Sequence, residues 1–126
     1  MDEHVLDASA MIALLWHEKG WDRVEPIRLR MASTVNVAEV GTILAHADVS
    51  LPDIRESIDS LKLTIIDFDR EQAIEAARLR PLTRRWGLSL GDRACLALAG
   101  LRNLPVITAD RNWSQAAPHL TITSIR

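Results

Sequence analysis

The chain has 126 residues, a length that predicts one domain, residues 1–126, able to bury a core of its own. Because 48% of the residues are hydrophobic and 25% are charged, the composition excludes a disordered chain and is typical of a globular domain. Fifteen basic residues against seventeen acidic ones give a net charge of −2, which excludes a strongly basic nucleic-acid module but allows a local basic face.

The sequence also carries information about the compartment. Cys95 is the only cysteine, which excludes an intrachain disulfide and a thiolate metal cluster and favours a reducing compartment. No apolar run approaches the roughly 18 residues that span a bilayer, and the first four residues lack the basic start of a signal peptide. We therefore expect a cytoplasmic protein.

Short apolar runs alternate with helical patterns in the N-terminal half. Residues 5–6 are predicted to form the first strand, and a helix over about 9–16 follows and is broken by Gly20. A second short helix is expected over about 21–29. Residues 32–35 form a brief predicted strand, after which apolar residues recur at helical spacing. These are Val37, Val40 and Leu44.

The C-terminal half continues this alternation. Ser50 is the predicted cap of a helix with Pro52 in its first turn. Residues 63–68 are a predicted strand, and a helix from about residue 70 should end near Pro81, because the residue before a proline avoids the helical region. The remaining elements are a helix from about Ser89 with an apolar face up to Leu101, strands over 105–109 and 120–125, and a helical turn over 112–116.

This alternation predicts an α/β fold with a mostly parallel central sheet flanked by helices on both faces. Right-handed crossovers place the carboxyl end of every strand, and the start of each following helix, along one edge of the sheet. Ligands of open α/β sheets bind at that edge. We therefore asked which residues lie there.

Four acidic residues are predicted to meet at this edge. Asp7 and Asp110 each follow a predicted strand directly. Glu39 and Asp92 each lie in the first turn of a predicted helix that starts at the same edge. Topology alone therefore brings together four carboxylates that are distant in sequence.

Each acid taken alone has an ordinary explanation as a helix cap. Aspartate is favoured after a strand, and Asn36-x-x-Glu39 and Ser89-x-x-Asp92 both resemble capping boxes. Four crowded carboxylates would repel one another, however, and some would take up protons unless a cation neutralised them. Oxygen ligands without paired histidine or cysteine favour Mg²⁺ or Mn²⁺ over zinc. Such an ion suits phosphoryl chemistry, because it polarises a phosphate and lowers the pKa of an attacking water.

Two hydroxyl side chains accompany the acids. Ser9 follows Asp7 by two residues, and Thr108 precedes Asp110 by two. Either hydroxyl can orient a carboxylate or a metal-bound water. The preference of serine for helix starts and of threonine for strands explains the two positions equally well.

Four blocks of the sequence have a recognisable combination of residues. They are Val-Leu-Asp-Ala-Ser at 5–9, Glu39 at a helix start, Leu-Ser-Leu-Gly-Asp-Arg-Ala-Cys-Leu-Ala at 88–97, and Val-Ile-Thr-Ala-Asp-Arg-Asn-Trp at 106–113. In this order the blocks resemble those of PIN-domain ribonucleases and, more narrowly, of VapC toxins from type II toxin–antitoxin systems. The resemblance covers nearly the whole chain.

The resemblance implies a three-layer PIN-like fold and a Mg²⁺- or Mn²⁺-dependent endoribonuclease that hydrolyses phosphodiester bonds in RNA. It implies that Asp7, Glu39, Asp92 and Asp110 form an acidic catalytic pocket. Asp7 and Asp92 would bind the metal directly, while Glu39 and Asp110 complete the site or hold a second ion. The resemblance also implies a homodimer and a VapB-type antitoxin that neutralises the toxin.

A basic segment precedes Asp92. No acidic residue occurs between positions 76 and 91, and four arginines fall within eight positions. Arg84 and Arg85 in particular can contact RNA phosphates without reading the base sequence. The competing explanation is a solvated helix end, where cations suit the helix dipole.

Other functions were weighed against these patterns. A signalling receiver needs a lysine at the end of a late strand, whereas the two lysines here are Lys19 and Lys62. A dinucleotide-binding domain needs a glycine-rich first turn, and residues 7–10 read Asp-Ala-Ser-Ala. The alternative that stays open is a PIN-fold RNA- or protein-binding module without catalysis.

Overall fold

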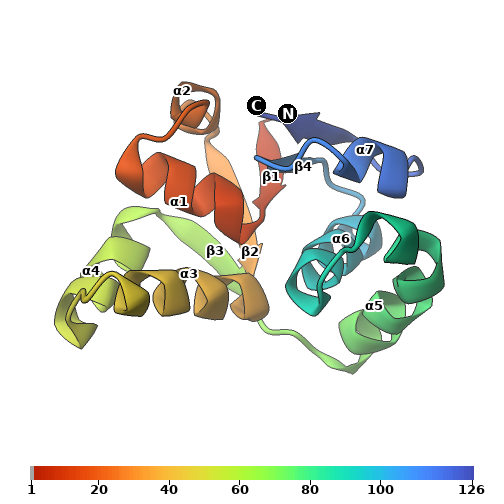
Figure 1. Ribbon diagram of the computed structural model, residues 1–126, viewed down its shortest axis with the longest axis horizontal. Helices are drawn as coiled ribbons and strands as arrows, with labels where there is room; N and C mark the ends of the chain where they lie inside the picture. The colour runs from red at the N-terminus through yellow and green to blue at the C-terminus, as the bar shows by residue number, and fades with distance from the viewer. Residues whose placement is uncertain (1) are drawn as a thin grey trace.

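Five strands form one parallel sheet in the computed structural model, which describes residues 2–126 (Figure 1). The strands are β1 (Glu3–Leu6), β2 (Leu29–Ser33), β3 (Leu63–Ile66), β4 (Val106–Thr108) and β5 (Ile122–Ser124). Their order across the sheet is β3-β2-β1-β4-β5, and each neighbouring pair is parallel. The predicted α/β class is confirmed.

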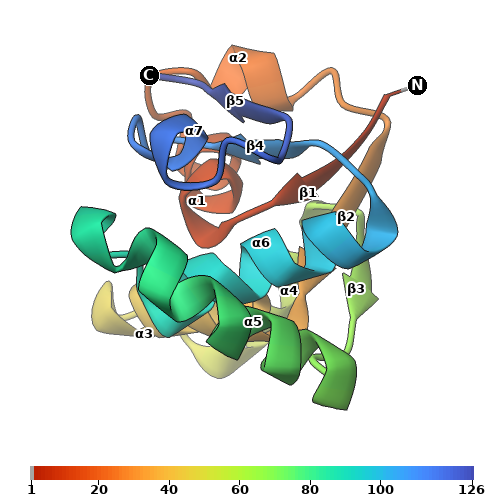
Figure 2. The same ribbon diagram turned by 90° about the vertical axis from the view of Figure 1, so that its right-hand side faces the viewer.

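Helices cover both faces of the sheet and give three layers. One face carries α1 (Ala8–Trp16), α2 (Trp21–Val24), α3 (Thr34–His46) and α4 (Leu51–Ser60), on the left in Figure 1. The other face carries α5 (Arg70–Thr83), the 3-10 turn η1 (Arg84–Trp86), α6 (Leu90–Arg102) and α7 (Trp113–Ala116). Figure 2, turned by 90°, shows α5 lying alongside α6, with which it packs.

The central strands are anchored on both sides. Leu6 of β1 and Ile107 of β4 pack among the helices of the first face, whereas their neighbours Val5 and Val106 pack among those of the second. All four side chains are at most 2% exposed. Successive side chains of a strand point to opposite faces, so each of these short strands packs against helices on both faces of the sheet. This fixes the strand ends from which Asp7 and Asp110 project.

Side-chain caps fix where helices begin at this edge. Asp7 is the cap of α1, and its Oδ1 accepts a hydrogen bond from the backbone N–H of Ala10 at 2.9 Å. Ser89 caps α6 in a capping box with Asp92, as predicted. The predicted cap Ser50 of α4 is confirmed as well.

Some predicted boundaries were wrong. The second strand is Leu29–Ser33 and not residues 32–35, because Ser33 caps α3 and the helix begins at Thr34. Glu39 therefore lies in the second turn of α3 and not in the first. The short helix predicted over 21–29 ends at Val24.

Helix α5 continues past the proline that was expected to end it. It runs through Pro81 to Thr83, whose hydroxyl donates to the carbonyl oxygen of Leu79 at 2.8 Å. Leu79 and Thr83 are buried, so packing stabilises a helical turn that local preference disfavours. Leu101, expected on the buried face of α6, is 51% exposed.

None of the helices formed between residues 2 and 126 has both the length and the apolar character needed to cross a membrane.

Candidate active site

A cavity of about 360 Å³ opens at the carboxyl edge of the sheet. After β1 the chain adds β2 and β3 on one side of that strand, and it then adds β4 and β5 on the other side. The direction in which strands are added therefore changes between β1 and β4. Such a switch point is where open α/β sheets bind ligands. The cavity lining includes all four acids singled out in the sequence: Asp7, Glu39, Asp92 and Asp110.

Asp7 is the most deeply buried of these acids, with 4% of its surface exposed. Its Oδ2 accepts a hydrogen bond from the Thr108 hydroxyl at 2.6 Å, and the Ser9 hydroxyl lies 2.8 Å from Oδ1 and 2.9 Å from Oδ2. Burial raises the pKa of Asp7 to about 6. The hydrogen bonds lower this pKa only in part, and the charge of Asp92 raises it further.

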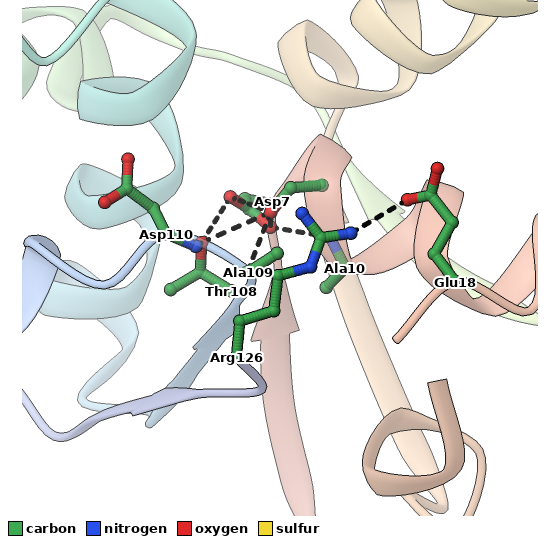
Figure 3. A network of polar contacts seen from close by, with 8 residues as sticks. Asp7, Ala10, Glu18, Thr108, Ala109, Asp110 and Arg126 are labelled. Carbon is green, nitrogen blue, oxygen red and sulfur yellow. Dashed lines mark hydrogen bonds and ion pairs between the residues drawn. The ribbon is translucent and has the colours of Figure 1, made fainter. Parts of the chain in front are cut away.

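The two hydroxyls are themselves held in place by the backbone (Figure 3). The N–H of Ala109 donates to Ser9 Oγ at 2.9 Å, and the N–H of Asp110 donates to Thr108 Oγ1 at 3.0 Å. With these bonds accepted, each hydroxyl directs its own proton to Asp7. Because Ser9 has a single hydroxyl proton, it donates to one oxygen of Asp7 at a time, which leaves lone-pair capacity on that carboxylate for a cation.

Asp92 combines a helix-capping contact with a place on the cavity lining. Its Oδ2 accepts the backbone N–H of Ser89 at 2.9 Å, while Ser89 Oγ accepts the backbone N–H of Asp92 at 3.1 Å. Burial raises the pKa of Asp92, the bonds to Ser89 lower it, and the charge of Asp110 raises it.

Glu39 is positioned by a contact between α3 and α6. The buried Asn36 donates through Nδ2 to Glu39 Oε1 at 2.8 Å and to the carbonyl oxygen of Gly91 at 3.0 Å. Asn36 therefore does not cap a helix, and its interpretation as part of a capping box was wrong. A Cβ on Gly91 would overlap the Glu39 carboxylate. Burial raises the pKa of Glu39, the Asn36 bond lowers it, and the charge of Asp92 raises it.

Asp110 and Trp113 form the β4 side of the cavity. Asp110 is exposed, and its Oδ1 accepts the backbone N–H of Asn112 at 2.8 Å. Trp113 is buried in the core. Its indole Nε1–H has no hydrogen-bond partner in the described part of the chain.

The predicted arginine pair lies away from this cavity. Arg84 and Arg85 are exposed in η1 and are absent from the cavity lining. The Arg85 guanidinium lies over the Trp86 ring, 5.2 Å from its centre. Arg93, which follows Asp92, donates to the backbone of α5.

Sequence reasoning missed four residues of the site. Asn36 and Gly91 hold Glu39, and their only sequence signal was the three-residue spacing between Asn36 and Glu39. Glu18 and Arg126 line the cavity and form an ion pair with a 3.1 Å N–O distance. They are 108 positions apart, and no local sequence pattern predicts their contact.

The donor set fits a hard divalent cation. The cavity offers carboxylate oxygens, which Mg²⁺ and Mn²⁺ prefer. Cys95 is buried, and burial together with the charges of the site acids raises the pKa of its thiol, so it stays protonated. Within residues 2–126, no three His, Cys, Asp or Glu side chains lie in an arrangement that already holds a metal ion, so the carboxylates would have to draw together around one. Burial raises the pKa values of Asp7, Glu39 and Asp92, and the charge of a neighbouring acid raises each of them further, so a divalent cation bound here would stabilise the ionised carboxylates.

The fold and the site together define an α/β protein with a carboxylate cavity at the switch point of a parallel sheet. A sequence model of the PIN domain matches residues 4–118. The chain therefore belongs to the PIN domain family, which confirms the resemblance drawn from the four sequence blocks.

Solved structures share this fold over nearly their whole length. A toxin–antitoxin complex from Klebsiella pneumoniae superimposes with a TM-score of 0.79 at 19% identity, covering 98% of each chain. VapBC-5 from Mycobacterium tuberculosis, a member of the VapBC toxin–antitoxin family, has a TM-score of 0.65 at 26% identity, covering 100% of this chain and 99% of its own. VapC20 of the same organism, described as a toxin that cleaves the sarcin–ricin loop, has a TM-score of 0.75 at 14% identity over 90% and 95%. A search of functionally curated proteins found no match.

Proposed function

We propose that this protein is a divalent-metal-dependent endoribonuclease and the toxin of a VapBC-type toxin–antitoxin pair. The observation that carries the proposal is the gathering of four carboxylates around one cavity in a PIN domain. Burial and mutual repulsion raise the pKa values of three of them, Asp7, Glu39 and Asp92. Helix capping alone does not require acids from four separate elements to share one cavity.

The proposed roles of the site residues are those that the resemblance to PIN-domain ribonucleases implies. Asp7 and Asp92 would bind Mg²⁺ or Mn²⁺ directly, and Glu39 and Asp110 would complete the site. When bound, such an ion polarises the phosphate and lowers the pKa of the attacking water.

Neighbouring side chains keep these carboxylates in place. Ser9 and Thr108 orient Asp7, and Asn36 holds Glu39 against α6. The alternative function is an RNA- or protein-binding PIN module without catalysis.

The direct test is a cleavage assay on purified protein and total RNA. We expect cleavage with Mg²⁺ or Mn²⁺ and none in excess EDTA. Asp92→Asn is the matched control: it should fold but not cleave, because asparagine can still accept the Ser89 N–H in the capping box but lacks the negative charge. Full cleavage in EDTA would refute the metal-dependent mechanism. A folded protein that binds RNA but leaves it intact with either metal would favour the non-catalytic module.

Arg84 and Arg85 are proposed to contact the RNA strand outside the cavity. The exposed position of both side chains on η1 supports this role. The logarithm of the RNA-binding constant falls linearly with the logarithm of the salt concentration. Each phosphate contact that is lost should reduce the size of this slope by about 0.7 for single-stranded RNA. The double variant Arg84→Ala/Arg85→Ala should therefore show a flatter slope with unchanged thermal stability. An unchanged slope would show that neither Arg84 nor Arg85 contacts the RNA phosphates.

A VapB-like antitoxin and a second copy of the chain are the proposed protein partners. Two further solved structures of the same fold support the antitoxin: those of VapBC2 from Rickettsia felis and of VapBC from Salmonella typhimurium, both bound to DNA. Co-expression with the product of an adjacent reading frame should suppress RNA cleavage and yield a co-purifying complex. Light scattering on the isolated chain would test the homodimer.

A further inference from the structure

The cavity has one cationic residue on its lining. Five carboxyl-bearing residues line it, namely Glu18 and the four site acids, against the single cation Arg126. If the proposed function holds, the cavity must receive the phosphates of a polyanion. The arginines of η1 lie outside the lining, and Arg126 is the only cation of residues 2–126 that lines the cavity.

The backbone around Arg126 is firmly anchored. Ile125 is buried, and its N–H donates to the carbonyl oxygen of Thr108 at 2.9 Å, next to the carboxyl end of β4. Gly20 lies against Ile125 with a φ of +94°, and a Cβ at position 20 would overlap the Ile125 backbone. This close approach brings the loop after α1, with Glu18, beside the end of β5.

The Arg126 side chain is available to a ligand. Its only ion pair within residues 2–126 is with Glu18, and the two side chains are 37% and 38% exposed. Figure 3 shows this pair bordering the region in which Asp7 and Asp110 lie. A half-exposed ion pair contributes little stability. A phosphate, in contrast, can accept two parallel hydrogen bonds from a guanidinium.

We propose that Arg126 binds a backbone phosphate of RNA at the mouth of the acidic cavity, and that Glu18 holds the guanidinium there until the phosphate replaces it. Glu18 thus has two effects. It orients Arg126 in the free protein, and it competes with the incoming phosphate. The proposal rests on the proposed function in that it names the contact by which this site takes an RNA substrate.

RNA binding without cleavage tests the contact. The probe is a fluorescein-labelled single-stranded RNA oligonucleotide of mixed sequence in Ca²⁺-containing buffer, with intact RNA verified on a gel. Fluorescence anisotropy over a range of salt concentrations gives the dissociation constant and its salt slope. Arg126→Ala should weaken binding and lower the slope by about 0.7. Arg126→Lys should restore the slope, because the charge is retained.

Arg70→Ala is the matched control. Arg70 also forms an exposed ion pair with a neighbouring glutamate, at 3.4 Å, and it does not line the cavity. This variant should bind RNA with an affinity and a slope close to those of the wild type. Thermal melting of each variant shows whether the protein is folded.

A double-variant cycle separates competition at Arg126 from a general charge effect. Glu18→Gln should tighten RNA binding in the wild-type background and have a clearly smaller effect in the Arg126→Ala background. Equal effects in both backgrounds, or a salt slope for Arg126→Ala that matches the Arg70→Ala slope, would overturn the proposal.

Cleavage of the same RNA with Mg²⁺ or Mn²⁺ is measured in parallel. Cleavage by the wild type with an unchanged slope in Arg126→Ala would refute the Arg126 contact and leave the proposed nuclease standing. Binding with the expected slopes but no cleavage would refute the nuclease and leave the contact standing.

Discussion

The helices α1 and α6 both begin at the cavity with an aspartate, yet the two acids are held in different ways. Asp7 is itself the cap of α1, is nearly fully buried, and takes hydrogen bonds from Ser9 and Thr108. Asp92 is the third residue of α6 and is held only by the cap of its own helix, Ser89.

This difference separates an acid held by tertiary packing from an acid held within its own helix. Thr108 reaches Asp7 from a strand 101 positions away, so the packing of β1 against β4 sets the orientation of that carboxylate. Asp92 accepts the Ser89 N–H, so the first turn of α6 sets its orientation. The comparison also shows that helix capping and a place in the site are compatible, because a carboxylate has lone pairs for both.

The largest effect is expected from removing one charge at either helix. Asp7→Asn and Asp92→Asn should each lower the rate of RNA cleavage by about 100-fold or more, because a catalytic metal ion lowers the activation free energy by several kcal/mol. Both variants should melt no lower than the wild type in EDTA, because asparagine can still accept the backbone N–H of Ala10 at position 7 or of Ser89 at position 92, and carboxylate repulsion is relieved. Wild-type cleavage by a folded Asp92→Asn protein would remove Asp92 from the site.

The burial of Asp7 predicts a pH dependence of stability without metal. The folded carboxyl has a pKa of about 6, against about 3.9 in an unfolded chain. Between these values the folded state binds more protons, so its stability falls as pH rises from about 4 to about 6. The contribution of Asp7 to this loss is about 3 kcal/mol.

Urea unfolding in EDTA at several pH values measures this effect. The free energy of unfolding of Asp7→Asn should lack this part of the decline. A parallel decline in the wild type and the variant would show that Asp7 is not the titrating group.

The approach of α6 to Glu39 gives the next test. Gly91→Ala would place a Cβ on the Glu39 carboxylate and should lower both cleavage and stability, the latter by about 2 kcal/mol. Gly100→Ala on the same helix is the control, because its Cβ would meet only Leu120 Cδ2 at 3.7 Å. That change should be neutral or slightly stabilising. Equal behaviour of the two variants in melting and cleavage would contradict the tight α3–α6 contact.

The smallest effect is expected at the hydroxyl that fixes Asp7. Thr108→Val keeps the shape but removes the donor to Asp7, which should weaken Mg²⁺ or Mn²⁺ binding by about tenfold and cost about 1 kcal/mol of stability. Thr83→Val removes an equally buried hydroxyl that bonds within α5. It should cost similar stability with unchanged metal affinity. Calorimetric metal titration distinguishes the two variants, and equal affinities would show that Thr108 does not position the ligand.

The sequence predicted much of the fold because its signals are local. Apolar periodicity located the strands and helices, and residues such as Ser50 and Ser89 marked helix starts. Errors occurred where tertiary contacts outweighed local preference, as at Pro81 inside α5. They also occurred where two caps competed, as at Ser33 and Asn36.

The sequence by itself determined that four acids come to one edge, because the alternation of strands and helices and the hand of the crossovers fix which ends meet. Only the tertiary structure decided how each acid is held and which other residues share its cavity. The raised pKa of Asp7 depends on burial by packed layers, and the contacts of Asn36 with Gly91 and of Glu18 with Arg126 join elements far apart in the chain. Such contacts depend on distances of a few ångströms between packed surfaces, which residue type and spacing along one segment do not specify.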